Sequence, residues 1–234
     1  MLLLAFLVVL TAVFTVAALA RQERSSPDQS MASGSATTPT TRAAPPTAAF
    51  LGDATTAGQG ASAPAARWTT LLCTEQGWVE VNHGVPGTGY AAAGFFPGQT
   101  AYTARVGDVV AAAPDVVVVS GGRNDDTSSN DYADSVGQVF AELRQGLPQA
   151  RLVATSPLWD DDETPEQLAE LGQVVRSQVE NVGGTYLDVG QPLRGRPGLV
   201  GPDGVQPDDE GHAAIAAAVE EAMTEAGLLP ITAA

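Results

Sequence analysis

The sequence lacks lysine entirely: all eleven of its basic residues are arginine, against 27 aspartate and glutamate residues. The formal net charge is therefore −16 at pH 7. A chain this acidic repels phosphate backbones and anionic headgroups, which argues against a nucleic-acid partner and against binding to a lipid surface through basic patches. We interpret the acidity as a feature that keeps an exported domain soluble.

Cysteine and histidine are nearly absent, with Cys73, His83 and His212 as the complete set. One cysteine cannot form an intramolecular disulfide, so the fold must depend on its hydrophobic core. Cys73 falls in an apolar stretch that we predict to be helical, where a buried, unreactive thiol is expected. No pair of these residues has the spacing of a zinc site, and we expect neither a metal nor a cofactor. The acidic run at residues 160–163 is interpreted as a solvated loop and helix N-terminus, with weak metal binding as the alternative.

The N-terminal part of the chain differs in composition from the rest. Residues 1–20 are almost entirely apolar and long enough to cross a bilayer, and Ala18-Leu19-Ala20 fits a signal-peptidase site. We predict a cleaved signal peptide or a membrane anchor, hence an exported or anchored protein that meets the membrane only through this segment. By charge asymmetry alone, Arg21 and Arg24 would instead keep the downstream part in the cytoplasm.

Three further regions follow the apolar segment. Residues 21–47 are rich in Ser, Thr, Ala and Pro without apolar periodicity, which predicts a disordered spacer. A single domain is expected over 48–229, and 230–234 form a short tail. With 44% hydrophobic residues, the chain can bury a core of ordinary size.

Short apolar runs alternate with amphipathic stretches through the domain. The run Val116–Val119 is continuously β-branched, which is typical of a strand buried on both faces. This alternation predicts an α/β fold of three layers, with helices on both faces of a central parallel sheet. In such sheets the site lies beyond the carboxyl ends of the strands. Strands are expected at 48–51, 78–81, 116–119, 152–155 and 185–188, helices at 61–77, 100–113, 132–147, 165–182 and 211–226, and a glycine-rich loop at 84–99.

Four segments with unusual residues occur at the expected strand ends. They are Gly52-Asp53-Ala54 after the first strand, 82–87 after the second, Gly122-Arg123-Asn124-Asp125 after the third, and 203–207 before the last helix. In order and spacing, over 48–226, they resemble the sequence blocks of the SGNH/GDSL hydrolases. The resemblance implies a flavodoxin-like three-layer fold and hydrolysis of esters, often acetyl groups on sugars or short acyl chains.

Two positions depart from the family's pattern. Ala54 stands where the family has the nucleophilic serine of Gly-Asp-Ser, and Gln206 stands where it has the histidine base of Asp-x-x-His. A methyl group cannot attack a carbonyl, and an amide cannot take up a proton near neutral pH. Since nucleophile and base act as one unit, their loss removes most of the chemistry. Asp203, which the resemblance makes the residue that orients the histidine, is present.

The resemblance also implies an oxyanion hole built from the backbone N–H groups of Ala54 and Gly87 and the side-chain amide of Asn124. Three such donors can hold a carbonyl or carboxylate oxygen without any nucleophile. Each residue also has a structural interpretation: Asn124 as a tie between loops, Gly87 as a turn glycine, and Asp203 as the cap of a turn.

Three functional hypotheses follow. The first is an inactive hydrolase-fold domain that binds an acyl or acetylated saccharide ligand, or a protein partner. The second is an active carboxyl- or acetylesterase with rearranged residues, for which His83 is the best substitute base. The third is a purely structural interaction domain. His212 is expected in the first turn of the last helix, in a capping or solvent-exposed role, and Asp53 is expected to anchor its loop.

Overall fold

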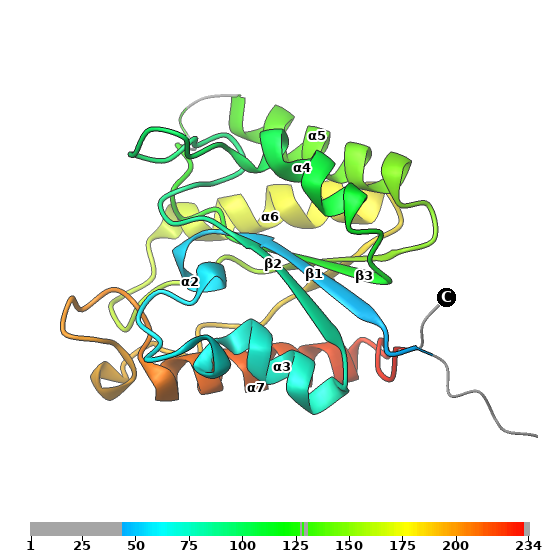
Figure 1. The fold of residues 1–234 in the computed structure, drawn as a ribbon. Helices are drawn as coiled ribbons and strands as arrows, with labels where there is room; N and C mark the ends of the chain where they lie inside the picture. The colour runs from blue at the N-terminus through cyan, green and yellow to red at the C-terminus, as the bar shows by residue number, and fades with distance from the viewer. Residues whose placement is uncertain (1–43, 127, 129–130, 232–234) are drawn as a thin grey trace, which may run out of the picture. The chain divides into compact units, whose positions relative to one another are not determined.

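The computed structural model describes residues 44–126, 128 and 131–231 (Figure 1). The predicted N-terminal segment 1–20, most of the spacer and the last three tail residues lie outside them. All strands run parallel in one sheet of order β2-β1-β3-β4-β5, so the predicted α/β fold with a central parallel sheet is confirmed. The strands are β1 (Thr47–Gly52), β2 (Val79–Gly84), β3 (Val116–Ser120), β4 (Arg151–Thr155) and β5 (Thr185–Leu187).

Helices cover both faces of the sheet (Figure 1). One face carries α3 (Trp68–Gln76) and α7 (Asp209–Glu225), and the other carries α4 (Tyr102–Ala111), α5 (Asp131–Gly146) and α6 (Glu166–Asn181). The strand order reverses between β1 and β3, as in flavodoxin-like folds, and a crevice at the carboxyl ends of these two strands is where such sheets bind ligands. Among the described residues, no helix is both long and apolar enough to cross a bilayer.

Alternate residues of β1 pack into two separate hydrophobic cores, one on each face of the sheet. Ala49 and Leu51 pack in the core beneath α4, α5 and α6, whereas Ala48 and Phe50 pack in the core beneath α3 and α7. Because the strand is buried on both faces, both sets of positions must be apolar, which explains the continuous apolar runs. Cys73 on α3 is buried, which confirms the predicted burial of its thiol, and this burial raises the pKa of the thiol to about 12.

Several expected boundaries were wrong. The single helix expected over 61–77 is divided into a 3-10 turn, η1 (Pro64–Ala66), and α3, because Arg67 between them is extended. The second strand continues three residues beyond Val81 to Gly84. A one-turn helix, α2 (Ala54–Ala57), was not predicted, since four residues are too few to show a helical period. A second 3-10 turn, η2 (Pro197–Leu199), precedes the loop that leads to α7.

Candidate functional site

The four segments singled out in the sequence converge at the carboxyl edge of the sheet. The Val85 N–H donates to the Gly52 carbonyl at 3.0 Å, and the Asn124 amide donates to the Thr88 carbonyl at 2.9 Å, so the ends of β1, β2 and β3 are joined directly. The fourth segment reaches the loop after α2. A Cβ added to Gly60 would lie 3.1 Å from the Cβ of Gln206.

Ala54 is the first residue of α2, directly after the capping residue Asp53, whose carboxylate accepts the Thr55 N–H at 3.0 Å. A backbone N–H at this helix position has no intrahelical acceptor. Within the described part of the chain, neither the Ala54 N–H nor the Gly87 N–H donates a hydrogen bond. Gly87 has a φ of +74°, which only glycine adopts without strain. Both donors are therefore available to an acceptor that enters the site.

Asn124 ties the third segment to the loop after β2, as its structural interpretation predicts. Its bond to the Thr88 carbonyl uses one of the two hydrogens of the side-chain amide. The same amide can therefore hold the loop and still offer its second hydrogen. Asn124 lies half-buried at the wall of a cavity of about 310 Å³ that Arg123, Trp159 and Leu168 also line.

Asp203 makes local hydrogen bonds. Its Oδ1 accepts the backbone N–H groups of Gln206 and Val205, both at 3.0 Å, and these bonds lower the pKa of the carboxyl. The structure thus shows the turn-capping role, and it fixes the backbone of residue 206 against the carboxylate. The side-chain oxygen of Gln206 is buried and has no hydrogen-bond partner within the described residues.

The expectation of solvent exposure at His212 was wrong. The residue lies in the first turn of α7 and is 0% exposed because that turn packs against the start of α3. Its Nδ1 accepts the Trp68 N–H at 3.4 Å and its Nε2 lies 3.2 Å from the Gln59 carbonyl, so it caps α3 rather than its own helix. Burial lowers its pKa, and both ring nitrogens are engaged, so it cannot act as a base in the site.

His83 lies on β2, one residue before the strand ends. Its Nε2 is buried without a partner among the described residues, and burial lowers the pKa of the ring. A neutral imidazole with an unengaged nitrogen keeps His83 as the candidate substitute base.

Arg105 is a structural centre of the site that the sequence analysis missed. Its guanidinium donates to the carbonyls of Gly52 and His83 at the ends of β1 and β2, and to the Thr88 hydroxyl at 2.7 Å; its Nε donates to the Thr100 carbonyl. The side chain is 7% exposed. Its position among Tyr102, Val106 and Val109 on the buried face of α4 was the available signal, because a charge on an apolar face requires partners.

Asp125 holds the long loop that contains Gly87. Its carboxylate accepts the backbone N–H groups of Tyr90, Ala91 and Ala92 at 2.8–2.9 Å. Three donated bonds at one carboxylate fix residues 90–92 relative to the end of β3. Asp125, the neighbour of Asn124, therefore anchors the loop that contains Gly87.

Asp53 is almost fully buried beneath α2. Desolvation raises the pKa of its carboxyl to about 6, although the Thr55 N–H bond and the nearby charge of Arg123 act in the opposite direction. The side chain caps α2, which confirms the predicted anchoring role.

The expectation that the whole acidic run at 160–163 is solvated was wrong for Asp160. Asp160 is 6% exposed because it forms an ion pair with Arg123 at 3.0 Å, and the Arg123 guanidinium lies 4.3 Å from the centre of the Trp159 ring. No cluster of three or more potential metal ligands occurs among the described residues. Arg123 and Trp159 line the cavity beside Asn124, and Asp160 holds the Arg123 guanidinium through the ion pair.

Comparison with known proteins places these features in context. A family model described as GDSL-like lipase/acylhydrolase matches residues 50–214. A GDSL lipase of Mycobacterium tuberculosis is 30% identical over 106 residues, a match that spans 42% of this chain and 45% of the relative, so the chain covers less than half of that protein.

Solved structures share the fold at low sequence identity. A salicylyl-acyltransferase from a tetracycline biosynthetic pathway has a TM-score of 0.65 at 20% identity, over 82% of this chain and 57% of that one. An acetyl-xylooligosaccharide esterase from Geobacillus stearothermophilus has a TM-score of 0.59 at 18% identity, over 82% and 99%. A carbohydrate acetylesterase from Sinorhizobium meliloti has a TM-score of 0.60 at 16% identity, over 79% and 100%.

Proposed function

Because the chain belongs to the GDSL-like lipase/acylhydrolase family, we propose that its domain is a degenerate member that has lost ester hydrolysis and retains a site for an acyl or acetylated ligand. One observation carries the proposal. The residue that opens α2, at the meeting point of the four segments, is Ala54, whose methyl group has no lone pair.

Among the described residues, no side chain near Ala54 offers a replacement for both the nucleophile and the base. Thr55 is 8% exposed and Thr56 is fully buried, so neither hydroxyl is presented to a substrate. His212 is committed to Trp68 and Gln59. Gln206, at the position of the base, carries an amide that does not accept a proton near neutral pH.

The binding part of the proposal rests on donors that remain available. The N–H groups of Ala54 and Gly87 have no acceptor in the described part of the chain, and the Asn124 amide retains one hydrogen. A ligand oxygen between them would gain hydrogen bonds from preorganised donors. Acetylated saccharides are the proposed ligand class, in keeping with the carbohydrate esterases that share the fold. A purely structural role remains the second candidate, supported by the bonds of Asn124 and Asp203 within the fold.

Assays of the purified protein test the loss of activity directly. We expect p-nitrophenyl acetate to be hydrolysed no faster than by an equal concentration of a control protein, because both the nucleophile and the base are missing. The measurement is release of p-nitrophenolate at neutral pH. Turnover that is lost in His83→Ala and retained in Cys73→Ser would contradict the proposal and favour a rearranged esterase based on His83.

Export is part of the proposal and rests on sequence alone, namely the apolar run of residues 1–20 followed by the spacer. We expect the protein in its native host to be processed after Ala20 or retained in the membrane. N-terminal sequencing after cell fractionation distinguishes these two. Recovery of an unprocessed chain from the cytosol alone would refute export.

A further inference from the structure

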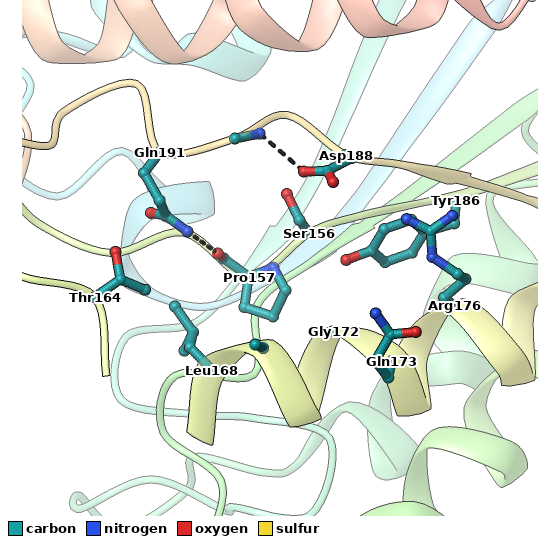
Figure 2. A pocket seen from close by; sticks show the side chains of 12 residues that line it. Ser156, Pro157, Thr164, Leu168, Gly172, Gln173, Arg176, Tyr186, Asp188 and Gln191 are labelled. Atoms are coloured by element: carbon teal, nitrogen blue, oxygen red, sulfur yellow. Dashed lines mark hydrogen bonds between the residues drawn. The ribbon is translucent and has the colours of Figure 1, made fainter. Parts of the chain in front are cut away.

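A second cavity, of about 240 Å³, lies between α6 and the segments that follow β4 and β5 (Figure 2). We call it the α6 cavity. Ser156, Pro157, Arg176, Tyr186 and Asp188 are among the residues that line it. None of the expected oxyanion donors contributes to its lining, so it is separate from the site described above.

Arg176 places a positively charged side chain at the α6 cavity that has no hydrogen-bond or ion-pair partner among the described residues. Its guanidinium lies 4.3 Å from the centre of the Tyr186 ring, and Figure 2 shows it above that ring at the edge of the cavity. Of the arginines in the described ranges, Arg176 is the one that makes neither a hydrogen bond nor an ion pair with the protein. Five N–H donors are thus held in place by stacking and left without acceptors, in a chain with a net charge of −16.

Two neutral side chains of the cavity make no hydrogen bond with the described residues. The Thr164 hydroxyl oxygen is buried, whereas the Gln173 amide is on an exposed residue at the edge of the cavity. Gln191, in contrast, is held in place at both ends of its amide, since it donates to the Pro157 carbonyl at 2.8 Å and accepts the Trp159 N–H at 2.8 Å. The cavity therefore combines a fixed floor with hydroxyl, amide and guanidinium groups that lack partners.

The wall around Tyr186 depends on a glycine. A Cβ added to Gly172 would lie 2.8 Å from the Tyr186 hydroxyl and 3.4 Å from Pro157 Cδ. Glycine within a helix costs about 1 kcal/mol relative to alanine, and here its absent side chain is what lets the tyrosine hydroxyl approach α6. The ring that supports Arg176 is therefore held by close packing.

The charge and hydrogen-bonding groups of the α6 cavity indicate which class of ligand fits it. A planar guanidinium pairs with a carboxylate or a phosphate group through two parallel hydrogen bonds. Asp188, an exposed carboxylate at the rim, disfavours a dianion such as phosphate more than a monoanion, and it accepts hydrogen bonds from hydroxyl groups. The volume is below the roughly 300–1,000 Å³ of sites for drug-sized ligands, which suits a single sugar ring.

We propose that the α6 cavity binds a hydroxylated monocarboxylate of the uronic-acid class, with the carboxylate on Arg176 and the hydroxyl groups on Thr164, Gln173 and Asp188. This inference is independent of the proposed loss of hydrolysis, because it shares no residue with the oxyanion donors. Leu168 lines both this cavity and the one beside Asn124. An acidic saccharide chain could therefore extend along α6 from one cavity to the other.

Titration of the protein with glucuronate, glucose and inorganic phosphate, followed by amide chemical shifts in NMR, tests the proposal. We expect glucuronate to shift residues of the α6 cavity with a Kd at least tenfold lower than that of glucose or phosphate. Arg176→Gln should weaken glucuronate binding at least tenfold. The matched control is Arg194→Gln, which should leave the Kd unchanged, since the only partner of that exposed side chain among the described residues is the exposed Glu163.

The outcomes are distinct. Equal affinity of wild type and Arg176→Gln for glucuronate, absence of shifts at the cavity, or tighter binding of phosphate each overturns the proposal. The comparison of ligands on the wild-type protein keeps the test decisive even if the variant is unstable. Esterase activity, in contrast, has no bearing on this result.

Discussion

Combining Ala54→Ser with Gln206→His is expected to give measurable esterase activity toward short acyl esters. The serine would stand at the start of α2, and the histidine would stand three residues after Asp203, whose Oδ1 already holds the backbone of residue 206. Both hydrogen bonds to Asp203 use Oδ1, so Oδ2 is left to orient the new imidazole. General-base assistance contributes on the order of 10²- to 10⁴-fold in rate, and we expect the double variant to exceed each single variant by at least about 10²-fold.

The single variants and a hole variant serve as controls. Ala54→Ser alone and Gln206→His alone should gain little, because nucleophile and base act together. Adding Asn124→Ala to the double variant should remove most of the gain, since loss of one oxyanion donor costs roughly 10²- to 10³-fold in kcat. The measurement is initial rate with p-nitrophenyl acetate and an acetylated xylooligosaccharide, with thermal unfolding of every variant. A double variant that melts like wild type yet remains inert would mean that the donors are not preorganised, and the structural hypothesis would then lead.

Replacing Arg105 with methionine is expected to lower the free energy of unfolding by at least about 2 kcal/mol, because buried acceptors at the strand ends lose their donor. The guanidinium donates to the Gly52, His83 and Thr100 carbonyls and the Thr88 hydroxyl, and methionine keeps the apolar stem but none of the donors. The Gly52 carbonyl would keep its bond from the Val85 N–H, so the main losses fall on His83 and Thr88. Acceptors left buried without partners each cost about 1–3 kcal/mol. Urea unfolding at constant pH measures the difference.

Arg196→Met is the matched control for that experiment. Arg196 is exposed, and within the described residues its side chain donates only to the nearby Pro192 carbonyl at 3.2 Å. Surface substitutions of this kind usually change stability by less than about 0.5 kcal/mol. If Arg105→Met and Arg196→Met have equal effects, the role assigned to Arg105 at the strand ends is wrong.

The centre of the sheet could be predicted because β1, β3 and most of β4 are buried on both faces. A run such as Val116–Val119 has no polar position, and this pattern distinguishes a central parallel strand without any knowledge of its partners. The short helix α2 could not be predicted in the same way. It is fixed by the Asp53 cap and by Gly58 in a left-handed conformation, and the sequence shows these only as two separate residues.

The positions of the candidate site came from the resemblance of four sequence segments to the SGNH/GDSL hydrolases, and they stay a prediction. The residues that support these positions could not be found in that way. Contacts such as His212 to Trp68, which are 144 residues apart in the chain, depend on how α7 packs against α3. Long-range pairs of this kind leave no local pattern, so the burial of His212 could not be inferred.

Because of the hydrogen bonds around the expected oxyanion hole, substitutions at its different residues are expected to disturb the fold to different extents. Asn124 and Asp125 hold the loop after β2, and the left-handed backbone of Gly87 excludes most side chains. The Ala54 side chain and the Gln206 side-chain oxygen, by comparison, make no hydrogen bond within the described residues. In a lineage released from selection for turnover, positions 54 and 206 can drift while purifying selection for folding alone preserves the hole. Reversion to catalysis would then require only two codons to change.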